Sequence, residues 1–274
     1  MAVIAVSRQY YSSGDEICTL LAEKSGYKVY TRKDIEHLIV KNGFSVKNFS
    51  KFNDKSLNVF LKFSRGKDEY LENLKLVLFE CASENNCIIV GRGATSLLRE
   101  ISNVVSIRFT SPFEHRAERL QLNEKCENII AKRNVFKEDR KQANFYKTYF
   151  KTKVSDSSCY DFTVSTEKFS KDAIADAVLS LVGKTITSDK EEEGNIELDK
   201  LLICQRIVNV LLSVYDINIT NLKATLGGRT ITLHGIADSS AIVDRALTMA
   251  ALELPEYKFE SDVTVVQDSI PFRR

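Results

Sequence analysis

The chain has 274 residues, 43% of them hydrophobic, which is enough for one large domain or two smaller ones. Its 39 basic and 37 acidic residues leave a formal net charge of +2, which argues against a general nucleic-acid-binding protein. Six scattered cysteines without a CxxC pair argue against a disulfide framework or a zinc site. Because no apolar segment approaches the roughly 20 residues that span a bilayer and the N-terminus lacks a signal-peptide pattern, we expect a cytoplasmic protein.

A strand, a loop and a helix are predicted at the start of the chain. Residues 3–6 form an apolar run, and a helical pattern begins about eight residues later. In place of the glycines and lysine of a GxxxxGK[ST] phosphate loop, the segment carries Ser12, Ser13, Gly14, Asp15 and Glu16. The backbone amides at the start of the helix could still bind an anion. Equally, the two serines are good N-cap residues, and the two acids favour the first turn of a helix that binds no ligand. The spacing alone therefore favours a structural cap.

Further apolar runs predict a parallel sheet. They cover residues 87–90, 104–109 and 160–164, with 28–30 as a shorter fifth strand, and helical stripes separate them. Strands that alternate with helices indicate a three-layer α/β domain over residues 1–184, whose last helix ends at Gly183 as a C-cap.

A second candidate anion site follows the strand at 87–90, which runs directly into Gly91, Arg92 and Gly93. The carboxyl ends of parallel strands form the ligand crevice of an open α/β sheet. An arginine at this edge is well placed to bind a phosphate or a carboxylate.

A basic segment covers residues 132–153, with eight Lys or Arg residues against two acids. It could close over phosphates, or bind nucleic acid with its aromatic residues as stacking platforms. Those residues are Phe145, Tyr146, Tyr149 and Phe150. Their i, i+4 spacing fits the buried stripe of a helix equally well. The three histidines are isolated, and we assign none a catalytic role.

The pattern changes after residue 184. Residues 185–195 are polar and acidic and indicate a linker. Residues 196–274 follow the order α-β-β-α-β, with a hairpin at Gly227 and Gly228, which predicts a small α+β domain with an antiparallel sheet.

Six short stretches, taken together and in order, resemble the cytidylate kinase-like family, which has the P-loop nucleoside monophosphate kinase fold. They are SRQYYSSGDEI, YKVYTRKDIE, IIVGRGATSLL, SPFEHRAERL, EDRKQANFYKTYF and YDFTVST. The resemblance covers residues 1–183 and implies nucleotide binding, with ATP and Mg²⁺ as the expected cofactors.

The resemblance assigns roles by position. The family's phosphate loop is usually like SREFGSGGREI, and the positions that match it are Ser7, Arg8, Ser12, Gly14, Glu16 and Ile17. Tyr11 and Ser13 replace glycines, and Asp15 replaces a basic residue. The monophosphate region contributes Arg32, and the GR after the third strand contributes Gly91 and Arg92.

The lid pattern of the family is close to DxxRAxYY, and it is matched only in part. Asp139 matches, but Gln142 stands at the arginine position, where Arg133 or Arg140 could substitute. Arg116 and Arg119 match the helix that leads to the lid. A transition-state arginine is worth on the order of 10³ or more in rate, so these departures threaten catalysis more than binding.

The C-terminal region is similar to a BON-like domain at Thr232, Leu233, Gly235 and Arg245. Such domains are associated with phospholipid surfaces, ligands or protein partners, which implies an interaction role rather than chemistry.

Three hypotheses stay open. The first is a nucleotide-binding regulatory or sensory protein with weak or lost phosphotransfer. The second is an active ATP-dependent nucleoside monophosphate kinase of the CMP type, in which Arg8, Arg92 and the lid arginines Arg133 and Arg140 replace the missing cations. The third is a non-catalytic scaffold, with the first domain as a homodimer. Nucleic acid is the disfavoured partner in all three.

Overall fold

The computed structural model describes residues 2–42 and 65–266, with only the backbone for 65–68. The chain divides into two compact units. Unit 1 comprises Met1–Leu38 and Glu80–Glu197, and unit 2 comprises Ile39–Phe79 and Leu198–Arg274. The domain boundaries at residues 184 and 196 stay predictions.

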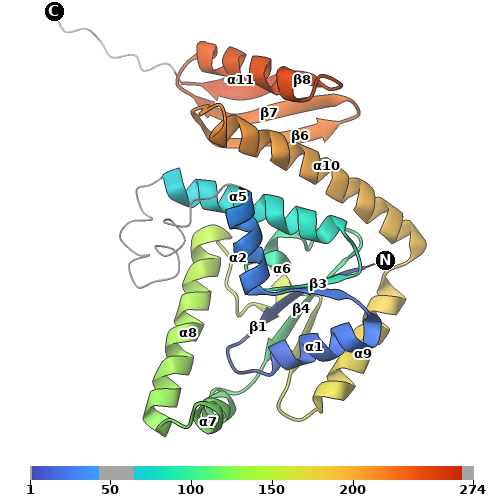
Figure 1. Cartoon of the computed structure of the whole chain (residues 1–274), viewed down its shortest axis with the longest axis vertical. Coiled ribbons are helices and arrows are strands. Elements are labelled where there is room, and N and C mark those ends of the chain that lie inside the picture. The colour runs from blue at the N-terminus through green and yellow to red at the C-terminus, as the bar shows by residue number, and fades with distance from the viewer. Residues whose placement is uncertain (1, 43–64, 267–274) are drawn as a thin grey trace, which may run out of the picture. The chain divides into compact units, whose positions relative to one another are not determined.

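Unit 1 is built on a five-stranded sheet with the order β2-β3-β1-β4-β5 (Figure 1). The strands are β1 (Val3–Arg8), β2 (Lys28–Tyr30), β3 (Cys87–Val90), β4 (Val104–Thr110) and β5 (Phe162–Ser165). Every neighbouring pair is parallel, which confirms the predicted α/β sheet. The first strand lies at the centre, so the loop that follows it emerges in the middle of the carboxyl edge.

The helices of unit 1 cover both faces of this sheet. They are α1 (Gly14–Ser25), α6 (Ala94–Leu97), α7 (Phe113–Glu124), α8 (Asn128–Tyr149) and α9 (Lys171–Thr185), with a 3₁₀ turn at Ser157–Cys159. Helices α1 and α9 lie side by side and share a core with Val6, Ile107 and Phe109 (Figure 1). Because strand side chains alternate between faces, Ser7 and Arg108 point to the opposite face.

Three helices contain residues of both units: α2 (Arg32–Lys41), α5 (Arg65–Ser83) and α10 (Ser188–Ser213). The segment predicted as a linker at 185–195 is helical from Ser188 onward. Acidic residues in its first turn favour the helix, and Gly194 packs where a Cβ would collide with Asn103. The predicted end at Gly183 is wrong, because α9 continues to Thr185.

Unit 2 contains a three-stranded sheet of β6 (Ile219–Gly227), β7 (Thr230–Ala237) and β8 (Lys258–Val265), with α11 (Ser240–Glu253) before the last strand. The predicted hairpin joins β6 and β7 antiparallel. The all-antiparallel prediction is wrong for β8, which runs parallel to β7. A helix between two neighbouring strands returns the chain to the same end of the sheet, and this connection makes them parallel.

Gly235 on β7 lies against an irregularity in β6. The register shifts between Thr220 and Lys223, and Gly235 has a φ of 151°. A Cβ there would lie 2.6 Å from Ile219 Cγ2 and 2.9 Å from the Thr220 carbonyl oxygen. The bulge therefore requires a residue without a side chain at this position.

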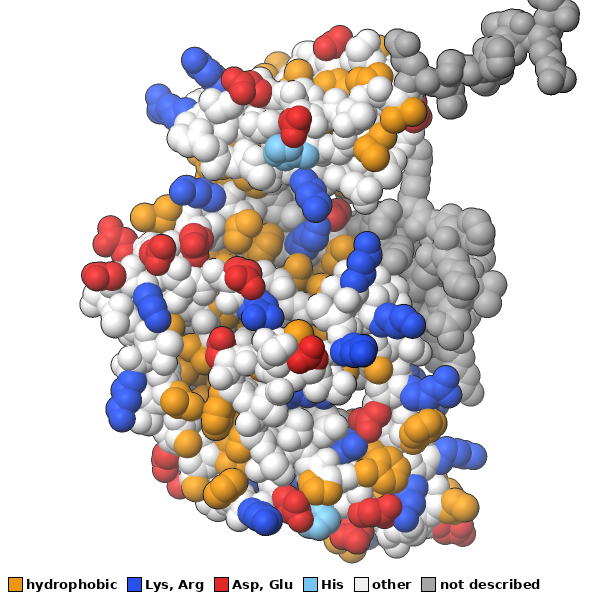
Figure 2. Space-filling model, turned by 180° about the vertical axis from the view of Figure 1, so that it is seen from behind, with side chains coloured by type: hydrophobic (Ala, Val, Ile, Leu, Met, Phe, Trp, Pro, Cys, Tyr) orange, Lys and Arg blue, Asp and Glu red, His pale blue; other side chains and the backbone are white. Residues whose placement is uncertain are grey.

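None of the helices in residues 2–42 and 65–266 is long and apolar enough to cross a membrane. Figure 2 shows Lys and Arg side chains interspersed with Asp and Glu over the visible face, as a small net charge predicts. Any strongly positive site must therefore be local.

The substitution Gly235→Ala should lower the free energy of unfolding by about 2 kcal/mol or more, because the methyl group meets backbone at a strained φ. Gly227→Ala is the matched control, since nothing lies within 4 Å of a Cβ there, and it should change stability by less than about 0.5 kcal/mol. Urea unfolding of the full chain by circular dichroism measures both. Equal losses would show that the bulge does not need glycine.

Candidate functional site

The loop between β1 and α1 has a backbone that usually requires glycine. Tyr11 has a φ of 60° and Ser13 a φ of 63°, both in the left-handed region. These are the two positions where the family resemblance places glycines. Tyr11 and Ser13 therefore adopt the backbone conformation that glycine favours, at a cost in strain.

The N-terminus of α1 is not capped in the way that the serines predict. Ser13 is at the N-cap position, but its side chain makes no capping hydrogen bond. The hydroxyl of Ser12 is buried, and it has no hydrogen-bond partner among the described residues. The Ser12 carbonyl accepts a 2.6 Å bond from Thr166 Oγ1, which fixes the loop from the end of β5. A buried hydroxyl without a partner is costly, and a ligand oxygen would satisfy it.

Arg8 connects the loop to the end of β3. Its Nε donates to Asp15 Oδ1 at 2.8 Å on the first turn of α1. A Cβ on Gly14 would lie 2.5 Å from the Arg8 Cβ, and one on Gly91 would lie 2.8 Å from Arg8 Nη1. Both glycines are therefore needed for the close approach of this arginine.

Two further arginines complete a positively charged cluster with Arg8. The Glu36 carboxylate forms ion pairs with Arg92 and with Arg32, whose Nε lies 2.6 Å from Glu36 Oε1. Burial, followed by the like charge of Arg32 and then of Arg8, lowers the pKa of the Arg92 guanidinium to about 9. The mutual repulsion that contributes to this shift is what a bound anion would relieve.

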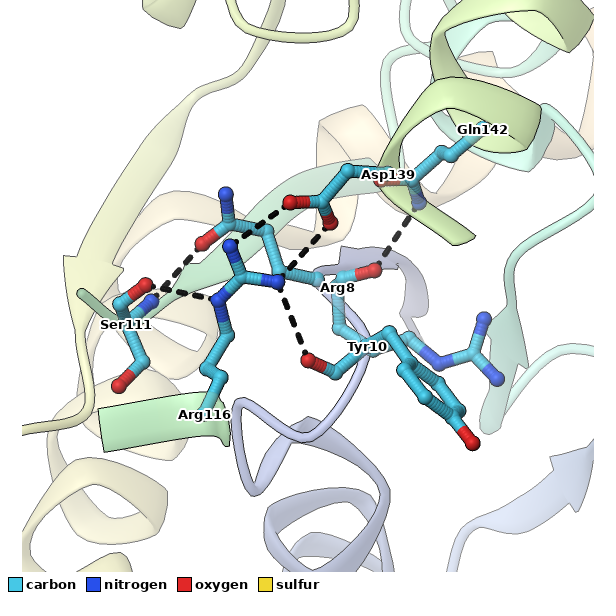
Figure 3. A network of polar contacts seen from close by, with 7 residues as sticks. Arg8, Tyr10, Ser111, Arg116, Asp139 and Gln142 are labelled. Atoms are coloured by element: carbon cyan, nitrogen blue, oxygen red, sulfur yellow. Dashed lines mark hydrogen bonds and ion pairs between the residues drawn. The ribbon is translucent and has the colours of Figure 1, made fainter. Parts of the chain in front are cut away.

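An ion pair between a buried arginine and a half-buried aspartate attaches helix α8 to the loop (Figure 3). Arg116 on α7 is 3% exposed, and it binds Asp139 through two hydrogen bonds of 2.9 and 2.8 Å. The same guanidinium donates to the carbonyls of Ser111 at 3.0 Å and Tyr10 at 3.3 Å. The predicted ligand residue Asp139 therefore has both carboxylate oxygens engaged by Arg116.

Gln142 stands at the lid arginine position and makes a second attachment. Its Nε2 donates to the carbonyl oxygen of Arg8 at 2.9 Å (Figure 3). Arg133 and Arg140 are exposed on α8, and Arg140 lies over the ring of Phe136 on its own helix. Neither arginine contacts the loop among the described residues, so the structure does not bring these two predicted residues to Arg8.

Tyr11 has a packing role that a glycine lacks. Its side chain packs against a cluster of buried residues from α7 and α8, which are Ala117, Leu120, Ala131 and Val135. Its hydroxyl donates to Glu124 at 3.0 Å and accepts from Asn123 at 3.2 Å. The ring thus anchors the loop to the two helices.

The remaining predicted residues lie around this centre. Glu16, on the first turn of α1, has Oε1 3.4 Å from Arg119 Nη2 and 3.5 Å from Lys171 Nζ. Tyr146 and Tyr149 are buried, so the buried-stripe interpretation is confirmed and the stacking-platform interpretation is wrong for these two rings. Gly93 permits the close approach of Phe150. No cluster of metal-binding side chains occurs in the described part of the chain.

A central strand, a loop with two left-handed residues and a helix at the carboxyl edge of a parallel sheet are the features of a P-loop kinase-like α/β domain. The cytidylate kinase-like family matches residues 3–168, and the chain belongs to this family.

Relatives of known name agree with this assignment. The chain is 25% identical over 142 residues to a cytidylate kinase of Methanocaldococcus jannaschii, covering 51% of this chain and 80% of that protein. It is 26% identical over 161 residues to a cytidylate kinase of Methanopyrus kandleri, covering 56% of this chain and 78% of that protein. The structure of an uncharacterized protein from Eubacterium ventriosum has the same fold, with a TM-score of 0.53, 18% identity and coverage of 67% of this chain and 98% of that one.

The left-handed conformation of Ser13 predicts an unusual response to glycine. Ser13→Gly should keep or raise the free energy of unfolding by up to about 1 kcal/mol, because it relieves backbone strain. Ser180→Gly, at an exposed position inside α9, should lower it by about 0.5 kcal/mol. Urea unfolding compares the two variants, and the same loss in both would contradict the strained loop.

The buried ion pair predicts a large difference between two neighbouring carboxylates. Asp139→Asn leaves the Arg116 guanidinium without its counter-charge and should cost about 2–4 kcal/mol of unfolding free energy. Glu138→Gln removes only an exposed pair with Lys141 and should cost less than about 1 kcal/mol. Thermal unfolding of the two variants checks this, and similar midpoints would rule out the anchoring role.

Proposed function

We propose that unit 1 binds the phosphate groups of a nucleotide and that its phosphoryl transfer is weak or lost. The observation that carries the proposal is the loop itself. Its residues 11 and 13 are left-handed, and its Ser12 hydroxyl has no partner among the described residues, which is the form of a phosphate cradle. A loop that served only as a helix start would gain nothing from this strain, since ordinary residues begin helices without it.

The cations near the loop support binding. Arg8 and Arg32 both lie close enough to repel the charge of Arg92, and two carboxylates, Asp15 and Glu36, form ion pairs with these arginines. Phosphate oxygens accept hydrogen bonds from guanidinium groups in a favourable bidentate geometry. The first-turn amides of α1 add the positive end of the helix dipole.

The same contacts support slow transfer. Phosphoryl transfer depends on cations that stabilise charge on the transferring group. The loop has no lysine, and the one arginine that enters it is paired with Asp15 at 2.8 Å. The lid position that usually carries an arginine is Gln142, whose amide is engaged with the Arg8 carbonyl.

ATP and Mg²⁺ fit the residues present in part. The orphaned Ser12 hydroxyl and the α1 amides would hold phosphate oxygens, with Arg8 beside them. The carboxylates of Asp15 and Glu16 offer the oxygen ligands that Mg²⁺ prefers, in addition to the phosphates themselves. A bound Mg²⁺ would neutralise charge on those phosphates.

An active CMP-type kinase is the second candidate. It is favoured by the position of Arg8, whose guanidinium lies beside Gly91 at the carboxyl edge of the sheet and could serve in place of the missing lysine.

Calorimetric titration of the full chain with ATP, CMP and a cyclic dinucleotide tests binding. At least one nucleotide should bind with a Kd below about 1 mM, and Arg92→Gln should weaken it at least tenfold by removing the central guanidinium. Arg99→Gln, at an exposed arginine of the same unit, should leave the affinity unchanged. The proposal fails if none of the three nucleotides binds at millimolar concentration.

A coupled ADP-release assay with CMP, UMP and dCMP separates the two candidates. Kinases of ordinary activity turn over at about 1–100 per second, and the missing cations should lower this by about 10³ or more. Turnover near one per second that disappears in Arg92→Gln would instead establish the active kinase.

We also propose that the C-terminal region is a BON-like interaction module that localises the nucleotide-binding unit or reports its state. Its matched residues have defined structural roles: Gly235 accommodates the β6 bulge, and Arg245 Nη2 donates to the Tyr215 carbonyl at 3.0 Å. Sedimentation of the full chain with vesicles of anionic phospholipid tests the lipid-binding form of this proposal, with vesicles of neutral phospholipid as the control.

A further inference from the structure

Arg108 is a buried cation that the proposed nucleotide site does not use. It lies near the C-terminal end of β4 and is 4% exposed. In the described part of the chain no carboxylate forms an ion pair with it, in contrast to Arg8, Arg92 and Arg116. A buried charge without a counter-charge is costly, so an arginine retained in this state calls for an explanation.

The hydrogen bonds of Arg108 are to two neutral hydroxyl groups. Its Nη1 donates to Ser7 Oγ at 2.7 Å and lies 3.4 Å from Tyr160 Oη. The Tyr160 hydroxyl in turn donates to the Val154 carbonyl at 2.9 Å. Burial raises the pKa of Tyr160, so this phenol is neutral at pH 7 and supplies no negative charge. The Tyr160 ring, 5.4 Å from the guanidinium carbon, compensates the charge only in part.

The guanidinium is placed at the functional end of the sheet. Arg108 is in register with Ser7, the residue directly before Arg8, so both lie where the central strands reach the carboxyl edge. Both point to the face opposite α1 and α9. Tyr146, which contributes to the raised pKa of Tyr160 after burial, has its hydroxyl 3.2 Å from Thr95 Oγ1. The surroundings are therefore polar and buried, with one uncompensated positive charge.

We propose that Arg108, held in place by Ser7 and Tyr160, forms an anion subsite that binds an oxyanion group, a phosphate or a carboxylate, of the second substrate of unit 1. The assignment to a second substrate rests on the proposed function, whereas the anion binding does not. The subsite selects ligands that carry an acidic group in addition to the phosphate that faces Arg8, Arg32 and Arg92. The anion completes the charge balance that the described residues of the chain leave open.

The test uses the full chain in an Arg92→Gln background, which weakens the site at the loop. Sodium phosphate and sodium acetate are the two probes, each added at constant ionic strength against chloride. In this background at least one probe should raise the midpoint of thermal unfolding by about 2–4 °C. The probe with the larger effect identifies the group as a phosphate or a carboxylate.

Arg108→Met is the decisive variant, because methionine has an apolar side chain without the charge. In chloride this variant should unfold at the same temperature as its background or at a higher one, since it removes an uncompensated charge. The increase of the unfolding midpoint with either probe should disappear. Arg108→Lys should keep the rise but require at least tenfold more anion. Tyr160→Phe, which keeps the ring beside the guanidinium, should keep the rise.

A lower midpoint for Arg108→Met together with an unchanged anion response would show that Arg108 is structural and overturn the proposal. If Arg108→Met does not fold, an anion response of Arg108→Lys equal to that of the background overturns it as well. The proposal is also overturned if neither probe raises the unfolding midpoint of the Arg92→Gln background. Loss of nucleotide binding alone, with the Arg108-dependent anion response intact, would refute the proposed function and leave the subsite standing.

Discussion

The buried pair between Arg116 and Asp139 is the contact on which the geometry of the nucleotide-binding unit depends. One guanidinium joins four parts of the chain: the loop at Tyr10, the end of β4 at Ser111, helix α7 that carries it, and helix α8 that carries Asp139. Because the guanidinium of Arg116 is almost fully buried, removing its carboxylate partner would leave a buried charge without a counter-charge. Helix α8 is thus held at a fixed position beside the loop, and the bond from Gln142 to the Arg8 carbonyl adds to this constraint.

This arrangement separates the shape of a phosphate loop from its chemistry. The shape depends on backbone torsions at residues 11 and 13, and these persist with a tyrosine and a serine in place. The chemistry depends on mobile cations that meet the transferring group. Here the arginine in the loop faces an aspartate, and the lid residue is bound to main chain. The function proposed above depends on this separation, because it requires a scaffold that binds phosphate without the groups that transfer it.

Much of the parallel sheet could be predicted from sequence, because strands buried on both faces are short apolar runs that stand out from the helical patterns around them. Two features of the fold were not predicted, each for a physical reason. The segment from Ser188 has a polar composition typical of linkers, yet acidic residues in its first turn favour a helix. Within this helix Gly194 packs closely on Asn103, a tertiary contact that composition does not reveal. The direction of β8 depends on the crossover through α11, which residue alternation does not encode.

Within the site, sequence position located Arg8, Arg32 and Arg92 but not their counter-charges. Glu36 lies one helical turn after Arg32, and only the fold shows that it also reaches Arg92. Asp139 matched a lid pattern, but whether its carboxylate faces a ligand or another residue is a tertiary property. The sequence signal for a buried cation at Arg108 was its position inside the apolar run VVSIRFT, in a strand whose side chains are buried on both faces of the sheet.

The side chain of Tyr11 has a consequence for any attempt to give this loop a glycine-rich sequence. Glycine at this position would relax the backbone and at the same time remove a ring that packs on α7 and α8. The two effects on the free energy of unfolding have opposite signs. A more relaxed loop is therefore obtained only together with a weaker attachment of that loop to the two helices.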